Sequence, residues 1–577
     1  MNKIVIFAIC SLACAVIFSF CSISFSPDIS LLSFPLGIAF SLLTSYFLVY
    51  KGFLKNDFKS FRIGRKLYQY ISYVLLVAFI VRRSGINETP FYLDLVTVIF
   101  WLLLFFSSIV VLRFVNEKNL PKFFPNWKKE IELHRLDRSI WDAKRILAEI
   151  VDWADALVQA VFMVLLIQIF FLQLYIIPSE SMVPSFLIGD RVVVFKTASG
   201  PVFPLSDVGI PSNKKYERGD VVVFRNPHYG MDRKSEVKSV VSQIVYMLTF
   251  TLVNMNVDDE GNPKADPLVK RVCGVPGEQL VMQDGVLYAR TAEKTDFEPV
   301  VFDSKYGCWN LNEVPNVLKP SIQTIPLSQT AYEAMIDVEK ARRDYDLESA
   351  KARFQSYVRR FDSLYLSRKG NLNLIPKENR AFKQDFTVDQ FEMDPFNYAL
   401  NLYACDNGNQ WFNAFMNSWM KVDYKIFESD PYSFANFKLN VMIKEKMALQ
   451  ILDCLETYAQ GGSEVHSNND GVSLAYLSFY TQILDQRNMP VFPANDEEGN
   501  PVYISNDEYF MMGDNRFNSL DMRHSYEQKT VALDKNDPYS VLYDSNMEPQ
   551  CVSKKRILGT AVYRFWPWSR RGPVQVK

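Results

Sequence analysis

The stretch PSESMVPSFLIGDRVVVFK, residues 178–196, marks the change from membrane-like to globular sequence. The apolar run before it, 154–177, is long enough to span a bilayer, and residues 191–196 have the β-branched character of a strand. Pro178 and Pro184 fix two φ angles, which keeps the neighbouring serines out of a helix. The segment is either an ordinary juxtamembrane turn or a device that holds a reactive serine at a membrane exit.

Composition excludes several classes of protein. The chain has 577 residues, a formal net charge of -1 and 49% hydrophobic residues, which argues against a nucleic-acid partner. Three of the eight cysteines fall in the first apolar run, the other five are widely spaced, and the four histidines lie far apart. This pattern predicts neither a disulfide framework nor a metal site, and no cofactor is expected.

Apolar runs predict a membrane region at residues 1–177. Five apolar runs occur in this region, and all but the third, 67–81, are long enough to span a bilayer. The first run resembles a secretory signal, but another follows at once without a clear cleavage site, so it is interpreted as a retained helix. We therefore predict about five transmembrane helices, at 4–25, 31–50, 67–81, 92–114 and 154–177.

Lysine and arginine are concentrated in two loops, 51–66 and 115–153. The charge bias of short loops predicts that both are cytoplasmic, so that after five spans the chain beyond Ile177 emerges on the outer side. Residues 128–145 could instead lie on anionic lipid as an amphipathic helix, although a cytoplasmic linker is the simpler interpretation.

The exported part is predicted to be a β domain interrupted by helices. Strand-like runs with Gly and Pro turns fill 178–299 and return over 496–577. Between them, 300–495 is predicted to be a mainly helical insertion, with a long helix at 331–369 and further helices at 390–420, 438–460 and 472–487. We refer to residues 300–495 as the insertion.

Two features of the β domain carry unusual side chains. Lys270 stands inside an apolar strand that ends in a Gly-rich turn, where an edge-strand lysine that blocks aggregation is the ordinary explanation. A strand at 509–512 leads into GDNRFNSLDMR, residues 513–523, whose side chains predict a rigid, internally hydrogen-bonded turn. We call residues 513–523 the polar loop.

A serine nucleophile needs a base, and the exported part has no credible histidine for that role. A lysine can serve when burial among apolar groups lowers its pKa well below the ordinary value of about 10.4, because desolvation disfavours the ammonium form. Lys270, which follows Leu268 and Val269, is the candidate.

At this point four segments resemble bacterial signal peptidase I in the family's order: 178–196, 218–227, 270–277 and 513–523. The resemblance implies that Ser181 is the nucleophile and Lys270 the general base of a Ser/Lys dyad, with the Ser179 hydroxyl as an oxyanion-hole donor. It further implies that Ser519 holds the lysine amine and that a charged set supports the site, namely Asp514, Asp521, Arg523 and Arg271.

The resemblance also implies how substrate binds. A signal-peptide C-terminus would add as a strand beside 174–181 and 267–270. Shallow pockets that admit only small side chains would give an Ala-X-Ala preference, although core packing is the alternative for each of their predicted lining residues, Tyr175, Ile177, Met182, Phe186, Leu268 and Val269. The partners implied are signal-peptide-bearing preproteins delivered by the secretion translocon, and membrane lipid. The implied location is the cytoplasmic membrane, with the catalytic domain on the outer face.

Two departures from the family pattern concern the polar loop and the insertion. Phe517 stands where an acidic residue commonly follows Gly-Asp-Asn-Arg, and both the insertion 300–495 and the additional N-terminal spans are large. We expect the insertion to modulate substrate access or partner contacts, and a Gly/Ser linker in its place to preserve cleavage of a short signal peptide. Two rival functions are a Ser/Lys self-cleaving repressor-type protease, which the apolar spans disfavour, and a non-enzymatic membrane receptor with vestigial catalytic segments.

Overall fold

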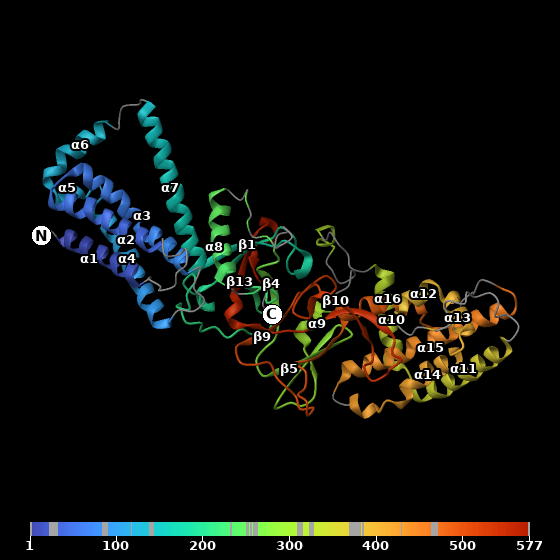
Figure 1. The fold of residues 1–577 in the computed structure, drawn as a ribbon. Helices are drawn as coiled ribbons and strands as arrows, with labels where there is room; N and C mark the ends of the chain where they lie inside the picture. The colour runs from blue at the N-terminus through green and yellow to red at the C-terminus, as the bar shows by residue number, and fades with distance from the viewer. Residues whose placement is uncertain are drawn as a thin grey trace.

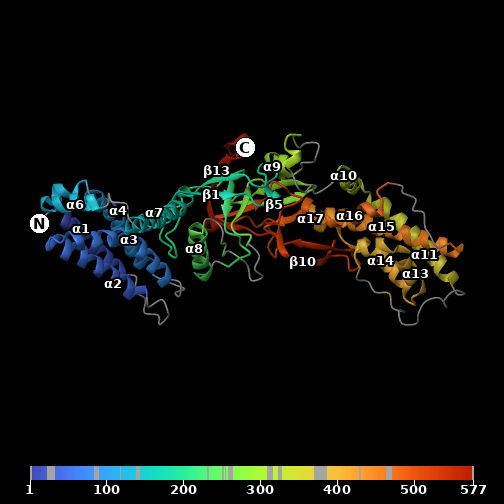
Figure 2. The same ribbon diagram turned by 90° about the horizontal axis from the view of Figure 1, so that it is seen from above.

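The computed structural model describes residues 3–21, 33–83, 90–116, 118–137, 143–230, 233–249, 253, 255, 257, 264–307, 316–321, 328–368, 382, 386–427, 430–462 and 471–574. Three regions follow one another along the molecule: the N-terminal helices, a β-rich middle and a helical end (Figure 1). The view from above shows the same order (Figure 2).

Four described helical segments are long and apolar enough to cross a membrane, which confirms a multi-span helical region. They are Lys3–Phe20, Pro35–Leu54, Phe91–Phe114 and Arg145–Phe170. These lie in α1 (Lys3–Cys21), in α2 (Ser33–Ser45) with the π-helix η2 (Tyr46–Leu54), in α4 (Phe91–Phe114) and in α7 (Ala143–Phe170).

The predicted third span, 67–81, lies within α3 (Phe58–Arg83), which is not among the four. The first turns of α3 carry Lys59, Arg62, Arg65 and Lys66, which lower its mean hydropathy. The helix nevertheless returns antiparallel along Pro35–Leu54. A Cβ on Gly37 would lie 3.2 Å from Leu75, and near the other end a Cβ on Gly52 would lie 3.0 Å from Phe61. The geometry therefore pairs α3 with the whole of that candidate span.

Short helices occupy the predicted linker between α4 and α7. They are α5 (Leu120–Phe123), the 3-10 turn η3 (Pro125–Trp127) and α6 (Lys128–Asp137). Trp127 is buried against Phe61 and Phe124, so this part of the linker packs on the end of the bundle. The predicted basic stretch 128–145 is thus partly helical, while its residues 138–142 lie outside the described ranges.

The β-rich middle is built on an eight-stranded sheet that starts directly after α7. Its order is β1-β2-β13-β3-β4-β9-β12, with β14 paired to β13. The strands are β1 (Leu172–Ile176), β2 (Arg191–Phe195), β3 (Val221–Phe224), β4 (Leu268–Gly274), β9 (Glu508–Met512), β12 (Val552–Ser553), β13 (Ile557–Trp566) and β14 (Gly572–Pro573). All paired neighbours are antiparallel. Segments from both sides of the insertion therefore meet in one sheet.

Two smaller sheets accompany it. The first has the order β7-β6-β5-β8, and the second is the hairpin β10-β11. Their strands are β5 (Glu278–Gln283), β6 (Val286–Thr291), β7 (Glu298–Pro299), β8 (Met489–Phe492), β10 (His524–Ala532) and β11 (Leu542–Met547). Strand β8 falls inside the range predicted for the insertion and pairs with β5, so the chain rejoins the β region before residue 495.

A loop of the β region enters the helix bundle. Phe203 is 1% exposed, and its ring lies 5.5 Å from that of Phe79 on α3 and 5.2 Å from that of Trp101 on α4. Helix α8 (Arg233–Leu248) adds Val237 and Val240 to the same apolar cluster. The bundle and the β region therefore share one core.

The helical end contains α10 (Gln329–Asp344), α11 (Leu347–Ser367), α12 (Val388–Met393), α13 (Pro395–Ala404), α14 (Gly408–Asn417), α15 (Pro431–Ala459), α16 (Leu474–Gln482) and α17 (Leu484–Arg487). Helix α9 (Val301–Gly307) lies instead against β6 in the β-rich middle (Figure 1). The prediction of one helix over 331–369 is wrong in one respect, because the chain breaks at Tyr345 and Asp346. The Asp346 carboxylate accepts hydrogen bonds from the backbone N–H groups of Glu348 and Ser349, which starts a new helix there. The predicted helix at 390–420 is likewise divided, into α12, α13 and α14.

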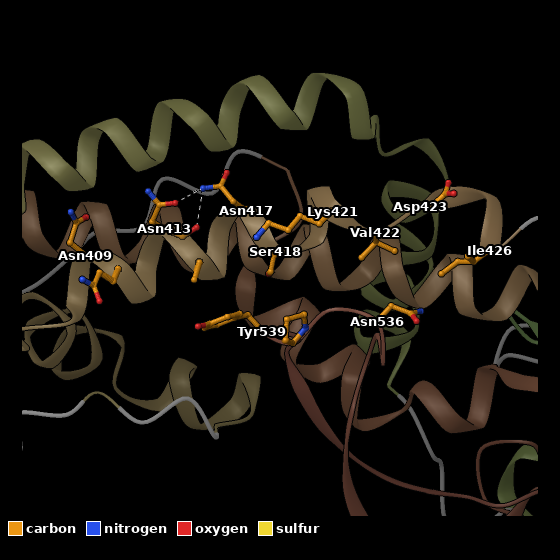
Figure 3. Close-up of a pocket in the computed structure, with 13 residues that line it drawn as sticks. Asn409, Asn413, Asn417, Ser418, Lys421, Val422, Asp423, Ile426, Asn536 and Tyr539 are labelled. Atoms are coloured by element: carbon orange, nitrogen blue, oxygen red, sulfur yellow. Dashed lines mark hydrogen bonds between the residues drawn. The ribbon is translucent and has the colours of Figure 1, made fainter.

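The helical end is fused to the β10-β11 hairpin. Leu533, Val541 and Tyr543 of the hairpin belong to the same buried cluster as the faces of α11, α14 and α15. Lys444 of α15 forms a fully buried ion pair with Asp537 at the hairpin turn. A cavity of about 690 Å³ lies at this seam, between the helix that carries Asn413 and the turn that carries Tyr539 (Figure 3).

Candidate active site

The predicted nucleophile lies in a one-turn 3-10 helix, η4 (Glu180–Met182), between β1 and β2. Ser179 precedes this turn in an extended conformation, as expected of a residue outside a helix, and its hydroxyl donates to Ser181 Oγ at 3.3 Å. Glu180 and Met182 are buried, whereas Ser179 is exposed and Ser181 half-buried. The turn therefore leaves the two predicted serines accessible while its other side chains anchor it.

The polar loop holds this turn from the other side. Asn515 donates from its backbone N–H to the carbonyl oxygen of Ser181 at 3.1 Å, and from Nδ2 to the carbonyl oxygen of Glu180 at 3.2 Å. Asn515 is fully buried. The two segments are far apart in sequence, so these bonds fix the position of the serine relative to the loop.

Gly513 is the point where three of the segments meet. A Cβ atom there would lie 2.5 Å from the carbonyl oxygen of Ser181 and would collide with Ser519 Oγ. Glycine is required here by close approach of backbone and side chain rather than by its own φ angle. Because Arg271 pairs with Met512 across β4 and β9, the residue after Met512 also lies beside Lys270.

Lys270 lies on β4 opposite Val222 of the central strand β3 and is 3% exposed. Burial lowers its pKa to about 8; nearby Asp521 opposes the shift, Arg523 adds to it, and Asp514 also opposes it. A substantial fraction of this amine is therefore neutral near neutral to mildly alkaline pH. Among the described residues no hydrogen bond joins Lys270 to Ser181 or Ser519, and the buried Ser519 hydroxyl has no partner.

The predicted supporting charges form two buried ion pairs. Arg271 donates from Nε and Nη2 to the two carboxylate oxygens of Asp514, both at 2.7 Å, and from Nη1 to the carbonyl oxygen of Gly219 at 2.7 Å. Arg523 donates from Nε to Asp521 at 2.8 Å, and Asp521 accepts the backbone N–H of Gly513 at 2.8 Å. All four charged side chains are buried, so the loop is held by electrostatics at low dielectric.

The six residues predicted to line the substrate pockets differ in exposure. Ile177, Met182 and Phe186 are at most 2% exposed and belong to one core cluster, against which Tyr175 and Val269 pack while partly exposed. Leu268 packs against the neighbouring cluster. Three of the six are thus closed to solvent in this structure.

Two strand edges remain open beside the serine turn. In the described structure β1 is the terminal strand of its sheet. The ladder between β4 and β9 includes Arg271, Val272 and Gly274 but not residues 268–270. On the side away from β2, β1 thus pairs with no described strand, and on the side away from β3, residues 268–270 of β4 are outside the β4–β9 ladder. Both segments predicted to flank an added strand therefore have a strand edge that another strand can join.

Sequence reasoning missed several residues of this site. Arg516 is fully buried and donates to Asp303 of α9 at 2.9 and 2.6 Å, and Tyr306 of the same helix lies 4.1 Å from the guanidinium of Arg271. Neither α9 residue belongs to a recognisable motif, and both lie in the insertion, so no signal in the sequence marked them. Within the described ranges no group of three or more His, Cys, Asp or Glu is placed to hold a metal ion.

The described structure thus combines four candidate membrane helices with an antiparallel sheet that carries a serine turn and a buried lysine. In comparison with known proteins, residues 150–316 match the family model for signal peptidase, peptidase S26. This part of the chain is therefore similar to signal peptidases.

Its curated relatives are distant. A signal peptidase I of Buchnera aphidicola is 38% identical over 71 residues, 12% of this chain and 23% of that protein. Signal peptidase I of Pseudomonas aeruginosa is 35% identical over 78 residues, 14% of this chain and 28% of that protein. Signal peptidase I of Haemophilus influenzae is 25% identical over 137 residues, which are 23% of this chain and 36% of that protein. The matched segments thus span about a quarter to a third of these relatives.

Proposed function

We propose that this protein is a membrane-bound serine endopeptidase that removes N-terminal signal peptides from exported preproteins, cleaving after small residues. The observation that carries the proposal is the junction at Gly513. There the Ser181 turn, the Ser519 loop and the strand with the buried Lys270 come together, and Lys270 has a lowered pKa. Nucleophile, base and support are supplied by residues from different elements.

The reaction begins when neutral Lys270 accepts the proton of the Ser181 hydroxyl. The serine oxygen attacks the scissile carbonyl carbon, and the charge that develops on the carbonyl oxygen is stabilised by the Ser179 hydroxyl and the Ser181 backbone N–H. Each such donor is typically worth about 3–4 kcal/mol. Collapse of the tetrahedral intermediate breaks the peptide C–N bond, and Lys270 returns the proton to the leaving amine.

The resulting ester joins Ser181 to the signal peptide. Water then attacks this ester, giving one proton to Lys270, and Ser181 recovers a proton as the carboxyl product leaves. Ser519 would orient the lysine amine, while Asp514, Asp521, Arg523 and Arg271 would support the loop without bonding to substrate. No cofactor takes part in this scheme.

Substrate binding would use the two open strand edges, 174–181 and 267–270. Tyr175, Leu268 and Val269, which are partly exposed, would contact the signal-peptide C-terminus first. Ile177, Met182 and Phe186 would form the closed floor beneath them, which suits a site that accepts only small side chains. Preproteins delivered by the secretion translocon are the proposed partners.

We propose that the protein resides in the cytoplasmic membrane with its β region on the outer face. Four candidate spans alone would return the chain to the side of its N-terminus. Because α3 runs along the whole of Pro35–Leu54, it crosses wherever that segment crosses, and the total becomes five. With 51–66 and 115–153 inside, the β region then lies outside.

The decisive experiment is turnover of a purified preprotein by the full-length chain in phospholipid nanodiscs, with the new N-terminus identified by mass spectrometry. Release of mature protein cut after an Ala-X-Ala sequence is expected. Binding of the preprotein without cleavage, in wild type and Ser181→Ala alike, would contradict the proposal and favour the receptor alternative.

A further inference from the structure

Both ends of the insertion touch the polar loop. Asp303 lies near the start of the insertion, in α9, and Gln486 lies near its end, in α17. The loop they contact, residues 513–523, contains the glycine at the junction of the candidate active site. The insertion is therefore in direct contact with the loop that holds the serine turn.

The start of the insertion holds the carbonyl group of Gly513. Arg516 donates from Nε to the Gly513 carbonyl oxygen at 2.8 Å. The same guanidinium makes a two-point contact with the carboxylate of Asp303, and both side chains are at most 2% exposed. A bidentate pair of this kind fixes direction as well as distance.

The end of the insertion acts on the N–H group of the same glycine. Asp521 accepts that N–H, and Arg523 holds the Asp521 carboxylate with two hydrogen bonds, at 2.8 and 3.0 Å. Arg523 also donates from Nη1 to the carbonyl oxygen of Gln486 at 3.1 Å. Each backbone polar group of Gly513 is thus held by a chain of bonds that ends in the insertion.

Helix α17 is itself fixed within the insertion. Arg487 donates from Nε and Nη2 to Glu339 of α10 at 2.8 and 3.0 Å, and this pair is at most 3% exposed. The guanidinium of Arg487 also lies 5.8 Å from the ring of Phe517, which packs against the core of the helical end. The departure at Phe517 from the family pattern therefore coincides with a contact that the insertion makes.

We propose that the insertion is a positioning element for the active site, holding the polar loop through Asp303 at one end and through Gln486, fixed by the Arg487–Glu339 pair, at the other. The kinetic part of this inference rests on the proposed function; the structural part does not. It replaces the expectation that a Gly/Ser linker could stand in for 300–495, since the linker would remove both holding points.

Loosening either point has a defined kinetic consequence. The charged groups that face Lys270 are Asp521, Arg523 and Asp514, all on the polar loop. If the loop moves away, Lys270 gains water, which raises its pKa; the loss of Arg523 acts in the same direction and the loss of Asp521 and Asp514 in the opposite one. Because burial is the largest cause of the lowered pKa, the gain of water decides the sign. The acidic limb of the pH profile should move to higher pH, whereas KM should change little because β1 and β4 lie outside the loop.

The test compares two matched substitutions in full-length protein in phospholipid nanodiscs. Glu339→Gln removes the charge that fixes Arg487. Glu445→Gln removes the charge paired with Arg353, in a more exposed Arg–Glu pair confined to the helical end. Asp303→Asn tests the other holding point. Backbone hydrogen exchange over 513–523 is measured together with kcat, KM and the pH profile on a short signal peptide.

Glu339→Gln and Asp303→Asn should each speed exchange over the polar loop, lower kcat by about 10- to 100-fold with KM within about twofold, and shift the acidic limb upward. Glu445→Gln should do none of these. Unchanged loop exchange in a folded Glu339→Gln variant would overturn the inference, whatever the activity. Suppose that the two variants exchange faster over the polar loop than the wild type does, but that the wild type itself shows no turnover. This result would sustain the positioning role and contradict the proposed function instead.

Discussion

Gly513 and Ser519 approach so closely that the glycine has no space for a side chain beside the serine hydroxyl. The two residues close a turn of the polar loop whose ends are fixed by buried ion pairs. The loop meets the Ser181 turn at the same point, through the hydrogen bond from Asn515. Any atom added at this junction must displace the Ser181 turn, Ser519 or both.

Substituting Gly513→Ala should therefore lower kcat by about 100-fold or more while the protein remains folded, because the methyl group forces the serine turn from its position. Cleavage of a short signal peptide measures the effect. Gly230→Ala is the matched control, since a Cβ there meets no atom within 4 Å. Equal activity in the two variants would show that the junction tolerates movement.

Ser181→Ala and Lys270→Met should each abolish cleavage and leave the membrane-bound fold intact. The first removes the nucleophile, and the second replaces the base by an apolar side chain of similar length. Lys196→Met is a suitable control, because Lys196 is another lysine whose pKa burial lowers to about 8, and its amine donates to Gln173 of β1 at 3.2 Å. Near-normal turnover by either dyad variant would rule out the assignment.

Activity should rise with pH through the lowered pKa of Lys270. The base must be neutral, and the neutral fraction increases as pH passes about 8 rather than the ordinary value of 10.5. By the same linkage, the unfolded chain binds more protons than the folded one between these values, so this lysine adds to stability as pH rises across that range. A kcat/KM profile flat from acid to alkaline pH would contradict the role of Lys270.

Lys444→Met should destabilise the helical end by about 3–5 kcal/mol, because it leaves Asp537 buried without its counter-ion. Urea unfolding followed by tryptophan fluorescence measures the loss. Lys294→Met, which breaks an exposed pair with Glu298, should cost at most about 1 kcal/mol. A double change to Lys444→Met with Asp537→Leu should recover part of the stability, and failure to do so would argue against an electrostatic origin.

The topology predicts which positions react with an impermeant thiol reagent. In a cysteine-free background, Lys55→Cys and Lys118→Cys should be labelled only from the cytoplasmic side, and Lys294→Cys only from the outer side. Labelling of Lys55→Cys from outside would mean that one of the first two spans is wrong, whereas labelling of Lys118→Cys from outside would mean that α3 does not cross with Pro35–Leu54. The experiment needs no activity and is independent of the catalytic proposal.

Sequence reasoning predicted the membrane region and the β character from local composition, and the family resemblance singled out four segments, three of which meet at Gly513. Apolar length predicted the spans, and turn-forming residues predicted the rigid loop. The predicted third span, 67–81, stays a prediction, because α3 mixes a basic first half with an apolar second half and is not among the four candidate spans, although it packs along Pro35–Leu54.

Contacts between distant segments could not be predicted in the same way. Asp303 is one of many acidic residues in the sequence, and only the fold brings it to Arg516. The hairpin residues Leu533, Val541 and Tyr543 read as an ordinary alternating strand pair, and nothing local shows that their apolar face is covered by the insertion. Long-range pairing depends on the whole topology rather than on the pattern of one segment.

Phe203 anchors the loop that follows β2 in the bundle of N-terminal helices. Its ring is enclosed by Phe79, Trp101 and Phe170, and its loop follows β2, the strand that comes directly after the serine turn. Under the proposed function, we expect this contact to set the height of Ser181 above the bilayer. The protein would then cut those signal peptides whose apolar segment ends at that height. It would not cut signal peptides whose apolar segment is longer or shorter.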